Sequence, residues 1–371
     1  MSLKEGDYWL AFSCFPGIGP RRFQALLKHF SSARKAWQAK ESIWRQLGLS
    51  KELTNEFLTF RNQFNSKQAK LDLEKHLTVF LTLEDETYPK LLKEIADPPF
   101  GLYVKGRLLA EDSKALAIVG TRKITAYGRE VTEKFTTWLT TRGFTIISGL
   151  ARGVDSVAHR VALGNKGRTL AVLGSGLDQI YPPEHKALAE EIITHGALVS
   201  EYPLGMPALP KNFPLRNRII SGLSLGVLVS EGEAKSGTKI TAKYAAEQGR
   251  EVFAIPGPIT SPTSAAPAEL IKIGAKLVSS GEDILEDLGI AQLDTKDKIT
   301  IDGQKQKSKN EAITMNNEEK QLWELLLTGV KHIDELVRKT KMPPAKTMSV
   351  LTLMEVSGKV KSIGNGMYMA V

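Results

Sequence analysis

Between residues 115 and 288, the chain alternates short apolar runs with segments that are long enough to form helices. The apolar runs lie at 116–119, 144–147, 169–173, 197–199, 225–229 and 252–255. Short, continuously apolar strands joined by helix-length connections are typical of a parallel sheet that helices cover on both faces. The sequence therefore predicts an α/β domain with a doubly wound, mainly parallel sheet.

Small and polar residues follow several of these runs. Ligands of doubly wound sheets bind beyond the carboxyl ends of the strands, so these residues are candidates for a site. Gly120-Thr121-Arg122 follows the first run, where small residues permit close approach and the arginine supplies a forked cation. Ser236-Gly237-Thr238-Lys239 can open a helix after the run 225–229. The free amides and hydroxyls of such a helix start predict an anion site.

The segment between Glu201 and Glu231 contains no acidic side chain, and its centre reads Lys211-Asn212-Phe213-Pro214-Leu215-Arg216-Asn217-Arg218. Cations, amides and an aromatic ring in one segment suit a phosphate backbone with a stacked base. We expect Arg216 and Arg218 at the surface, because buried guanidinium groups need anionic partners and none is nearby in the sequence. The alternative is a basic loop with one buried phenylalanine.

The composition favours a polyanionic partner and a reducing compartment. Fifty Lys and Arg residues against 41 Asp and Glu residues give a formal charge of +9, which favours partners such as nucleic acid. The single cysteine, Cys14, cannot form an internal disulfide or a cysteine-based metal site. We expect a cytosolic protein without a membrane association, since the sequence shows no signal peptide and no apolar run of membrane-spanning length.

Motifs of the common cofactor and catalytic sites are absent from the sequence. Nothing reads GxxxxGK[ST], GxGxxG or HExxH, and there is no convincing nucleophile elbow or cysteine–histidine pairing. Asp155 and Asp178 lie beside turns, where capping of the following helix is the expected role. We therefore expect no metal, no cofactor and no enzymatic activity.

Two smaller domains are expected at the ends of the chain. Residues 1–75 show helical periodicity, and Phe15-Pro16-Gly17-Ile18-Gly19-Pro20 resembles the turn of a helix-hairpin-helix element. Such a hairpin contacts DNA phosphates through backbone amides, and the alternative is a module for packing or oligomerisation. The α/β domain, with short strands and turns before it, is expected over 76–289.

The polar residues 290–315 are expected to be a linker, and 316–371 a winged helix. Helices are expected over 317–327, 332–340 and from Pro343-Pro344 to Ser357, followed by a hairpin over 360–371. The third of these helices carries Lys346 among mostly apolar and hydroxyl residues. DNA reading and protein interaction both remain open for this domain.

Several motifs of the central region resemble the DNA-processing protein A family, also called Smf. They are Val119-Gly120-Thr121-Arg122, the segment 148–159, Gly174-Ser175-Gly176-Leu177-Asp178 with Tyr181-Pro182, Ser200-Glu201-Tyr202-Pro203, the segment 213–220 and the segment 252–257. The resemblance implies an extended Rossmann-like domain in a bacterial cytosolic homodimer that is not an enzyme. It further implies sequence-independent binding of single-stranded DNA, protection of incoming strands during natural transformation, and loading of the RecA recombinase.

The resemblance also implies roles for individual residues. Arg122, Lys211, Arg216 and Arg218 would hold phosphates, Phe213 would stack on or wedge against a base, and Asn217 would bond the sugar or backbone. Gly120, Thr121 and the helix start Ser236-Gly237-Thr238 would line the pocket. Alternatively, Arg216 and Asn217 brace the loop. This chain has Lys239 where the family commonly has a leucine, and this lysine can add a phosphate contact.

Two other functions fit parts of the sequence. An enzyme of nucleotide metabolism with a Rossmann-like fold would place a phosphate at a helix start like Ser236-Gly237-Thr238 and hydrolyse a nucleotide, but an obvious catalytic Glu-Arg set is missing. A transcription regulator would read duplex DNA with the winged helix and sense a ligand with the central domain. The weakly basic third helix and the cationic central segment argue against the regulator.

Overall fold

The computed structural model describes residues 3–46, 49–290, 317–327, 329–357, 359–364 and 366–370. The chain divides into two compact units, 1–294 and 295–371, which are considered separately. Of the segment 290–315, which the sequence predicts to be a linker, residues 291–315 lie outside the described residues. None of the helices in the described ranges has the length and apolar character needed to cross a membrane.

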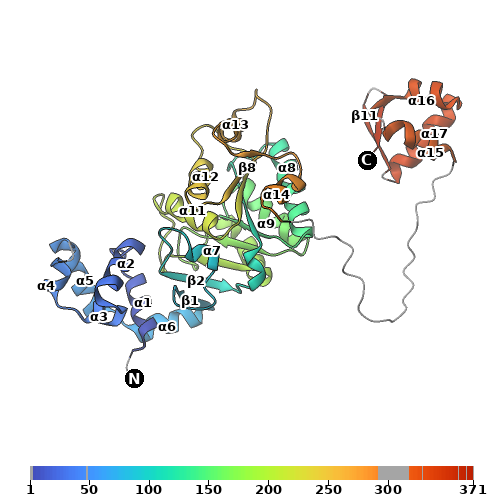
Figure 1. The fold of residues 1–371 in the computed structure, drawn as a ribbon. Helices are drawn as coiled ribbons and strands as arrows, with labels where there is room; N and C mark the ends of the chain where they lie inside the picture. Colours follow the sequence, from blue (N-terminus) through green and yellow to red (C-terminus); the bar gives the residue numbers. More distant parts are fainter. Residues whose placement is uncertain are drawn as a thin grey trace. The chain divides into compact units, whose positions relative to one another are not determined.

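The first unit holds a helical region followed by the α/β domain (Figure 1). Its helices are α1 (Glu5–Ser13), α2 (Pro20–Phe30), α3 (Ala33–Gln38), α4 (Glu41–Gln46), α5 (Lys51–Gln63), α6 (Ser66–Lys75), α7 (Lys90–Lys93), α8 (Ala126–Thr141), α9 (Val154–Gly164), α10 (Lys186–His195), α11 (Asn212–Gly222), α12 (Thr238–Glu247), α13 (Ala265–Lys272) and α14 (Gly281–Asp287). Its strands are β1 (Thr78–Thr82), β2 (Gly101–Gly106), β3 (Ala115–Val119), β4 (Thr145–Ser148), β5 (Thr169–Val172), β6 (Ala197–Ser200), β7 (Gly226–Val229), β8 (Glu251–Ala254) and β9 (Lys276–Leu277).

A nine-stranded sheet with the order β1-β2-β6-β5-β4-β3-β7-β8-β9 forms the centre of this unit. β1, β2 and β6 pair in antiparallel fashion, whereas the strands from β6 to β9 run parallel to one another. The chain proceeds outward from β3 through β4 and β5 to β6, and then returns to β7 on the other side of β3. The strand order thus reverses between β4 and β7, and clefts in doubly wound sheets form at such a point.

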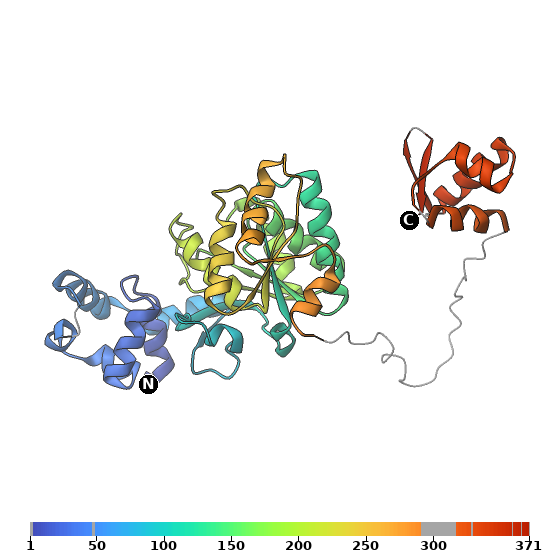
Figure 2. The same cartoon turned by 45° about the horizontal axis from the view of Figure 1, so that its top comes forward.

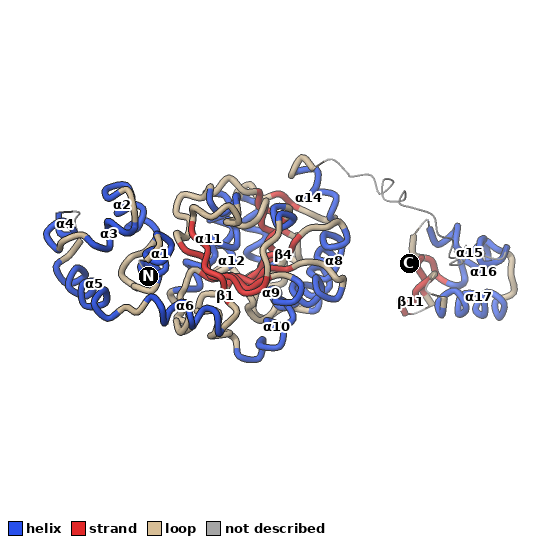
Figure 3. Tube along the Cα trace, turned by 90° about the horizontal axis from the view of Figure 1, so that it is seen from below, coloured by secondary structure: helices blue, strands red, loops and turns tan. Residues whose placement is uncertain are grey.

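Helices cover both faces of the sheet, as Figure 3 shows with the strands lying between helical layers. One apolar core packs Ile219 and Ile220 of α11 and Ala245 of α12 against the strands. The core on the opposite face contains Phe135 of α8 and Ala158 of α9. The predicted doubly wound, mainly parallel α/β fold is therefore confirmed, with β1 and β2 extending it at one edge.

The helical region, blue in Figure 2, lies next to the sheet domain, with α1 against β1 and β2 and α6 against β1. Their aromatic core continues into the sheet domain, because Phe23 stacks on Phe100 with ring centroids 4.1 Å apart. The hydroxyl groups of Ser13 and Tyr103 form a hydrogen bond of 2.6 Å across the same boundary. The helical region therefore shares a core with the sheet, although the sequence suggests a separate domain over 1–75.

The second unit contains α15 (Asn317–Leu327), α16 (Ile333–Thr340) and α17 (Pro344–Val356). Strands β10 (Lys331–His332), β11 (Val360–Gly364) and β12 (Met367–Ala370) form a three-stranded sheet in the order β10-β12-β11. The helices enclose a small core around Leu322, Leu336 and Leu351. This arrangement confirms the predicted winged helix, while the domain boundaries proposed from the sequence stay predictions.

Candidate nucleic-acid interface

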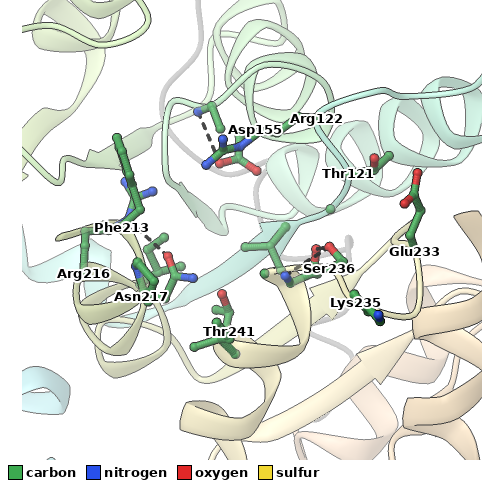
Figure 4. A pocket seen from close by; sticks show the side chains of 18 of the residues that line it. Thr121, Arg122, Asp155, Phe213, Arg216, Asn217, Glu233, Lys235, Ser236 and Thr241 are labelled. Carbon is green, nitrogen blue, oxygen red and sulfur yellow. Dashed lines mark hydrogen bonds between the residues drawn. The ribbon is translucent and has the colours of Figure 1, made fainter. Parts of the chain in front are cut away.

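A cavity of about 660 Å³ opens at the carboxyl ends of the central strands. Its walls come from the segments that follow β3, β4, β5 and β7 and from α11, and Figure 4 shows the side chains that line it. Nine predicted site residues line it: Gly120, Thr121, Arg122, Phe213, Arg216, Asn217, Ser236, Gly237 and Thr238. The structure thus brings together three segments, each of which the sequence separately predicts to belong to a binding site.

The loop after β3 is fixed by its backbone, although Arg122 itself is exposed. Glu231, which is 2% exposed, accepts hydrogen bonds from Thr125 N at 3.0 Å and Thr125 Oγ1 at 2.6 Å. Its backbone oxygen accepts a further bond from Thr121 N at 2.8 Å. Gly153 has a φ of +75°, and a side chain there would overlap the backbone of Thr121 and Arg122. The base of the Arg122 side chain is therefore held in place, while its guanidinium group is exposed, with Cζ 5.7 Å from the centroid of the Phe213 ring.

Phe213 and Tyr181 form an aromatic wall of the cavity. Their ring centroids lie 5.6 Å apart at an interplanar angle of 43°. Phe213 belongs to the first turn of α11, which Asn212 fastens to the β5 loop through a 3.0 Å bond from Nδ2 to the oxygen of Gly174. The wall offers a partly exposed ring surface on which a base can stack.

The opposite wall is the start of α12 (Figure 4). Ser236 Oγ and Thr238 Oγ1 form a 2.7 Å hydrogen bond, and Ser236 Oγ also accepts from Thr238 N at 3.2 Å. Gly237 has an α-helical φ of −60°, and no atom lies within 4 Å of the place where a Cβ would be. Neither the backbone nor the packing requires glycine there, so this residue leaves the entrance to the helix amides open.

Arg216 lies in the floor of the cavity, contrary to the expected surface position. It is 4% exposed, and its Nη1 donates to the backbone oxygens of Gly149 (2.8 Å) and Val172. Burial lowers the pKa of Arg216 to about 10, against the opposing effect of Asp155. Asp155 accepts bonds from the amides of Gly149 and Ala151 rather than capping α9. These contacts link α11 to the loop after β4 and to the last residue of β5, and they fit the alternative interpretation, in which Arg216 braces the loop.

Arg218 is also buried, so its predicted role as a phosphate ligand is corrected. It is 4% exposed and is absent from the cavity wall. Its Nη2 lies 2.5 Å from Oε2 of Glu201, and its Nε lies 3.5 Å from Oδ2 of Asp97. Both carboxylates belong to other segments of the chain, so residues near Arg218 in the sequence do not reveal the pairing. Arg218 instead ties α11 to the segment that follows β6 and to the loop that precedes β2.

We expect Arg218→Ala to destabilise the fold by roughly 3 to 5 kcal/mol, because removing one partner leaves a buried carboxylate unpaired. Burial already raises the pKa of Glu201 and Arg218 counteracts this effect, so the variant raises that pKa further. A folded-state pKa above the unfolded value costs stability as the pH rises. The deficit against wild type should accordingly be smaller at pH 5 than at pH 8 in urea unfolding. Equal deficits at both pH values would contradict this account.

Two other predicted residues lie outside the cavity wall. Lys211 is exposed and precedes α11, whereas Lys239 pairs with Glu269 at 2.5 Å and donates to the backbone oxygen of Ala234. An additional phosphate contact from Lys239 would require this pair to break. Its predicted role is therefore not supported by the geometry, because the side chain points to α13 rather than into the cavity.

The cavity is also lined by Lys123, Lys235 and Tyr181, which are not among the predicted site residues. Lys123 follows the predicted turn 120–122, and Lys235 precedes the predicted helix start 236–238. A positive charge next to an expected anion site is the sequence signal that indicates these two lysines. Tyr181 belongs to the motif Tyr181-Pro182, but the sequence does not indicate that its ring lines a site. Among the described residues, Arg122, Lys123 and Lys235 form no ion pair, so the exposed rim is cationic apart from Glu233.

Fold and site together define a class: a Rossmann-like protein whose strand ends form a cavity with unpaired cations, a helix start and an aromatic wall. The chain belongs to the DNA recombination-mediator protein A family, whose profile matches residues 79–289. The profile of the DprA winged helix domain matches residues 306–366.

Relatives from several bacteria cover much of the chain. It is 41% identical to Protein Smf of Synechocystis over 298 residues, which are 79% of this chain and 75% of that protein. It is 48% identical to Protein Smf of Escherichia coli over 259 residues, or 68% of this chain and 69% of the relative. These matches agree with the family that the sequence motifs resemble.

Two solved structures have a similar fold. The crystal structure of DNA processing protein A from Streptococcus pneumoniae has a TM-score of 0.66 at 33% identity and covers 77% of this chain and 99% of that chain. DNA processing protein A from Helicobacter pylori, whose structure concerns its single-stranded DNA binding mode, has a TM-score of 0.51 at 30% identity. That likeness covers 56% of this chain and 95% of the other.

Proposed function

We propose that this protein binds single-stranded DNA without regard to sequence, in the cavity at the carboxyl ends of β3, β4, β5 and β7. The observation that carries the proposal is the meeting of three unpaired cations, a helix start and the Phe213–Tyr181 wall in one cavity. Cations attract the backbone and aromatic rings accept any base, so such a site needs no sequence readout. The similar structure from Helicobacter pylori, which is described for its single-stranded DNA binding mode, supports this assignment.

A salt titration of binding to a fluorescent oligothymidine tests the proposal. If Arg122, Lys123 and Lys235 neutralise about three phosphates, the slope of log K against log salt should be near −2 for a single strand. A duplex of the same length serves as competitor. Weak binding, or binding that the duplex displaces readily, would refute a single-strand cavity.

We further propose that the protein protects incoming strands in natural transformation and loads RecA onto them, as the family resemblance implies. In this role it acts as a binding protein of the cytosol rather than as an enzyme. Strand exchange by RecA on oligonucleotides coated with a single-strand binding protein measures this step. A variant in which a new side chain fills the cavity should stimulate strand exchange less than wild type. Equal stimulation by such a variant would contradict the link between the cavity and RecA loading.

We propose a homodimer as the working state. Ile273 and Leu277 are 80% and 52% exposed beside β9, the last strand of the sheet. An exposed apolar edge of this kind invites pairing with a second copy. Sedimentation should show a dimer at micromolar concentration, and Leu277→Glu should shift it to monomer. A wild-type protein that stays monomeric would count against the dimer.

The nucleotide hydrolase remains a weaker candidate. Among the residues that the structure describes, Asp155 and Glu233 are the two acidic side chains that line the cavity. Asp155 is buried under Arg216 and held by two amides, so it is poorly placed to activate water. Release of a base or phosphate from nucleoside monophosphates by the purified protein would restore this candidate.

A further inference from the structure

A basic segment without acidic residues covers α2 and α3 of the helical region (Figure 1). Residues 8–40 contain no aspartate or glutamate, and their Lys and Arg residues are Arg21, Arg22, Lys28, Arg34, Lys35 and Lys40. All six side chains are exposed, and among the described residues none of them forms an ion pair with a carboxylate. This segment therefore presents a concentrated positive charge that the cavity does not use.

The solvent face of α2 carries three of these cations. Arg21 and Lys28 are seven residues apart, so they lie on the same side of the helix, about 10.5 Å apart along its axis. Arg22 lies next to Arg21, and its Nη1 donates to the backbone oxygen of Gly17 at 2.8 Å. The opposite side of α2 is apolar and packs into the core, where Phe23 is 1% exposed. The core thus fixes the helix, and its cations point to solvent.

The carboxylates that border this segment in the sequence have other partners. Asp7 pairs with Lys70, and Glu41 pairs with Arg45. Glu5 accepts a hydrogen bond of 2.5 Å from the first backbone amide of α3. Glu5 offsets part of the positive charge at the start of α3, so the face of α2 is the stronger part of the surface.

The aromatic rings of α2 and α3 pack into the helical core. Phe23 lies against Trp9 with ring centroids 4.8 Å apart, and Trp37 lies against Phe12 at 5.2 Å. Phe30 is partly buried against the same core. A cationic face without an exposed ring binds phosphates but cannot stack on an unpaired base. Such a face favours the polyanion with the densest backbone charge, which is duplex DNA with one charge per about 1.7 Å of its axis.

The turn before α2 is packed rather than open to a phosphate. A side chain at Gly17 would approach Leu53 Cδ1 to 2.3 Å, and Ile18 is 4% exposed. The glycine is therefore required by packing of the turn against the helical core. A contact with DNA would come from the side chains of α2 and not from the amides of this turn.

We propose that the solvent face of α2, with Arg21, Arg22 and Lys28, binds the phosphates of duplex DNA. It is a second nucleic-acid surface, because none of these residues lines the cavity. Both surfaces belong to the first compact unit. A duplex with a single-stranded tail can occupy both of them, and two linked contacts bind more tightly than either one alone. The protein therefore prefers a tailed duplex to a duplex or a single strand.

The test measures fluorescence anisotropy with a blunt duplex, a short oligothymidine and the same duplex carrying an oligothymidine tail. Arg21→Gln with Lys28→Gln should lower the salt slope for the blunt duplex by about 1.8, because each phosphate contact contributes about 0.9. At about 0.1 M salt this corresponds to about 10- to 60-fold weaker binding. The variant should bind the short oligothymidine like wild type and should lose the additional affinity for the tailed duplex.

Lys67→Gln with Lys75→Gln is the matched control, because both lysines are exposed on α6 and the variant removes the same charge. It should bind the duplex like wild type, and circular dichroism should show that both variants are folded. Equal losses in the two variants would overturn the proposal, because net charge alone would then attract the duplex. Unchanged duplex binding by the α2 variant would also overturn it and would leave this face to an acidic protein partner. A wild-type protein that binds the duplex but not oligothymidine would refute the cavity and support the α2 face.

Discussion

Replacing Gly237 by leucine should weaken binding to oligothymidine at least 10-fold while changing the melting temperature by no more than about 2 °C. Gly237 lines the cavity at the start of α12, and its φ of −60° suits any residue. Space for a side chain exists there, since nothing lies within 4 Å of the Cβ position. The new side chain would project into the space that the strand needs and cover the amides of the helix start. Fluorescence anisotropy and thermal melting measure the two effects.

Gly164 provides a matched control for this experiment. It is the last residue of α9, it is exposed, and it also has no atom within 4 Å of a built Cβ. It does not line the cavity, so Gly164→Leu should bind like wild type. A Gly237→Leu protein that melts normally and binds normally would remove the cavity from the mechanism, whatever the effects of charge substitutions nearby.

The sheet could be predicted because each strand is recognisable from the apolar residues of its own segment. The predicted run 116–119 is β3 (Ala115–Val119), and the run 197–199 is β6 (Ala197–Ser200). Their apolar residues are buried on both faces, and this property depends on each segment rather than on its partners. The turns predicted after these strands meet in one cavity because parallel strands bring their carboxyl ends to the same edge of the sheet.

The errors arose where long-range contacts decide the environment of a residue. Arg218 appeared to lack an anionic partner, but folding brings Asp97 and Glu201 to it from distant segments. Arg216 reaches the backbone oxygens of Gly149, in the loop after β4, and of Val172, at the end of β5, which are likewise remote in the sequence. The basic segment around α11 therefore contains two buried arginines. It exposes fewer positive charges than its sequence suggests. The cations that remain exposed come mainly from neighbouring turns.

A long-range contact also joins the helical region to the α/β domain. Sequence periodicity separates residues 1–75 from the α/β domain, yet Phe100 belongs to the aromatic core of the helices. Trp9 and Phe23 both contact its ring, with centroids 6.5 Å and 4.1 Å away. Local pattern assigns Phe100 to the strand region and cannot show that its partners lie elsewhere in the chain.

Removing residues 1–75 should therefore be far more damaging than removing the winged helix. The deletion would expose Phe100 and Tyr103, which are 7% and 1% exposed, and would strip Leu10 and Leu73 from the core beside β2. Each large apolar side chain contributes about 1.5 to 3 kcal/mol by burial, so the loss is comparable to the 5 to 15 kcal/mol stability of a typical domain. We expect the fragment 76–371 to aggregate, or to melt at least 10 °C below the full chain.

The fragment 1–294 is the matched comparison, because the first compact unit has its own cores and contains the whole cavity. It should stay soluble, melt like the sheet domain of the full chain and keep its affinity for oligothymidine within about threefold. Soluble yield, thermal melting and anisotropy would be measured on both fragments. If 1–294 is folded but no longer binds the strand, the winged helix carries the binding. This result would favour the transcription regulator that is the alternative function. If both fragments fold equally well, the shared aromatic core around Phe100 is not what stabilises the sheet edge.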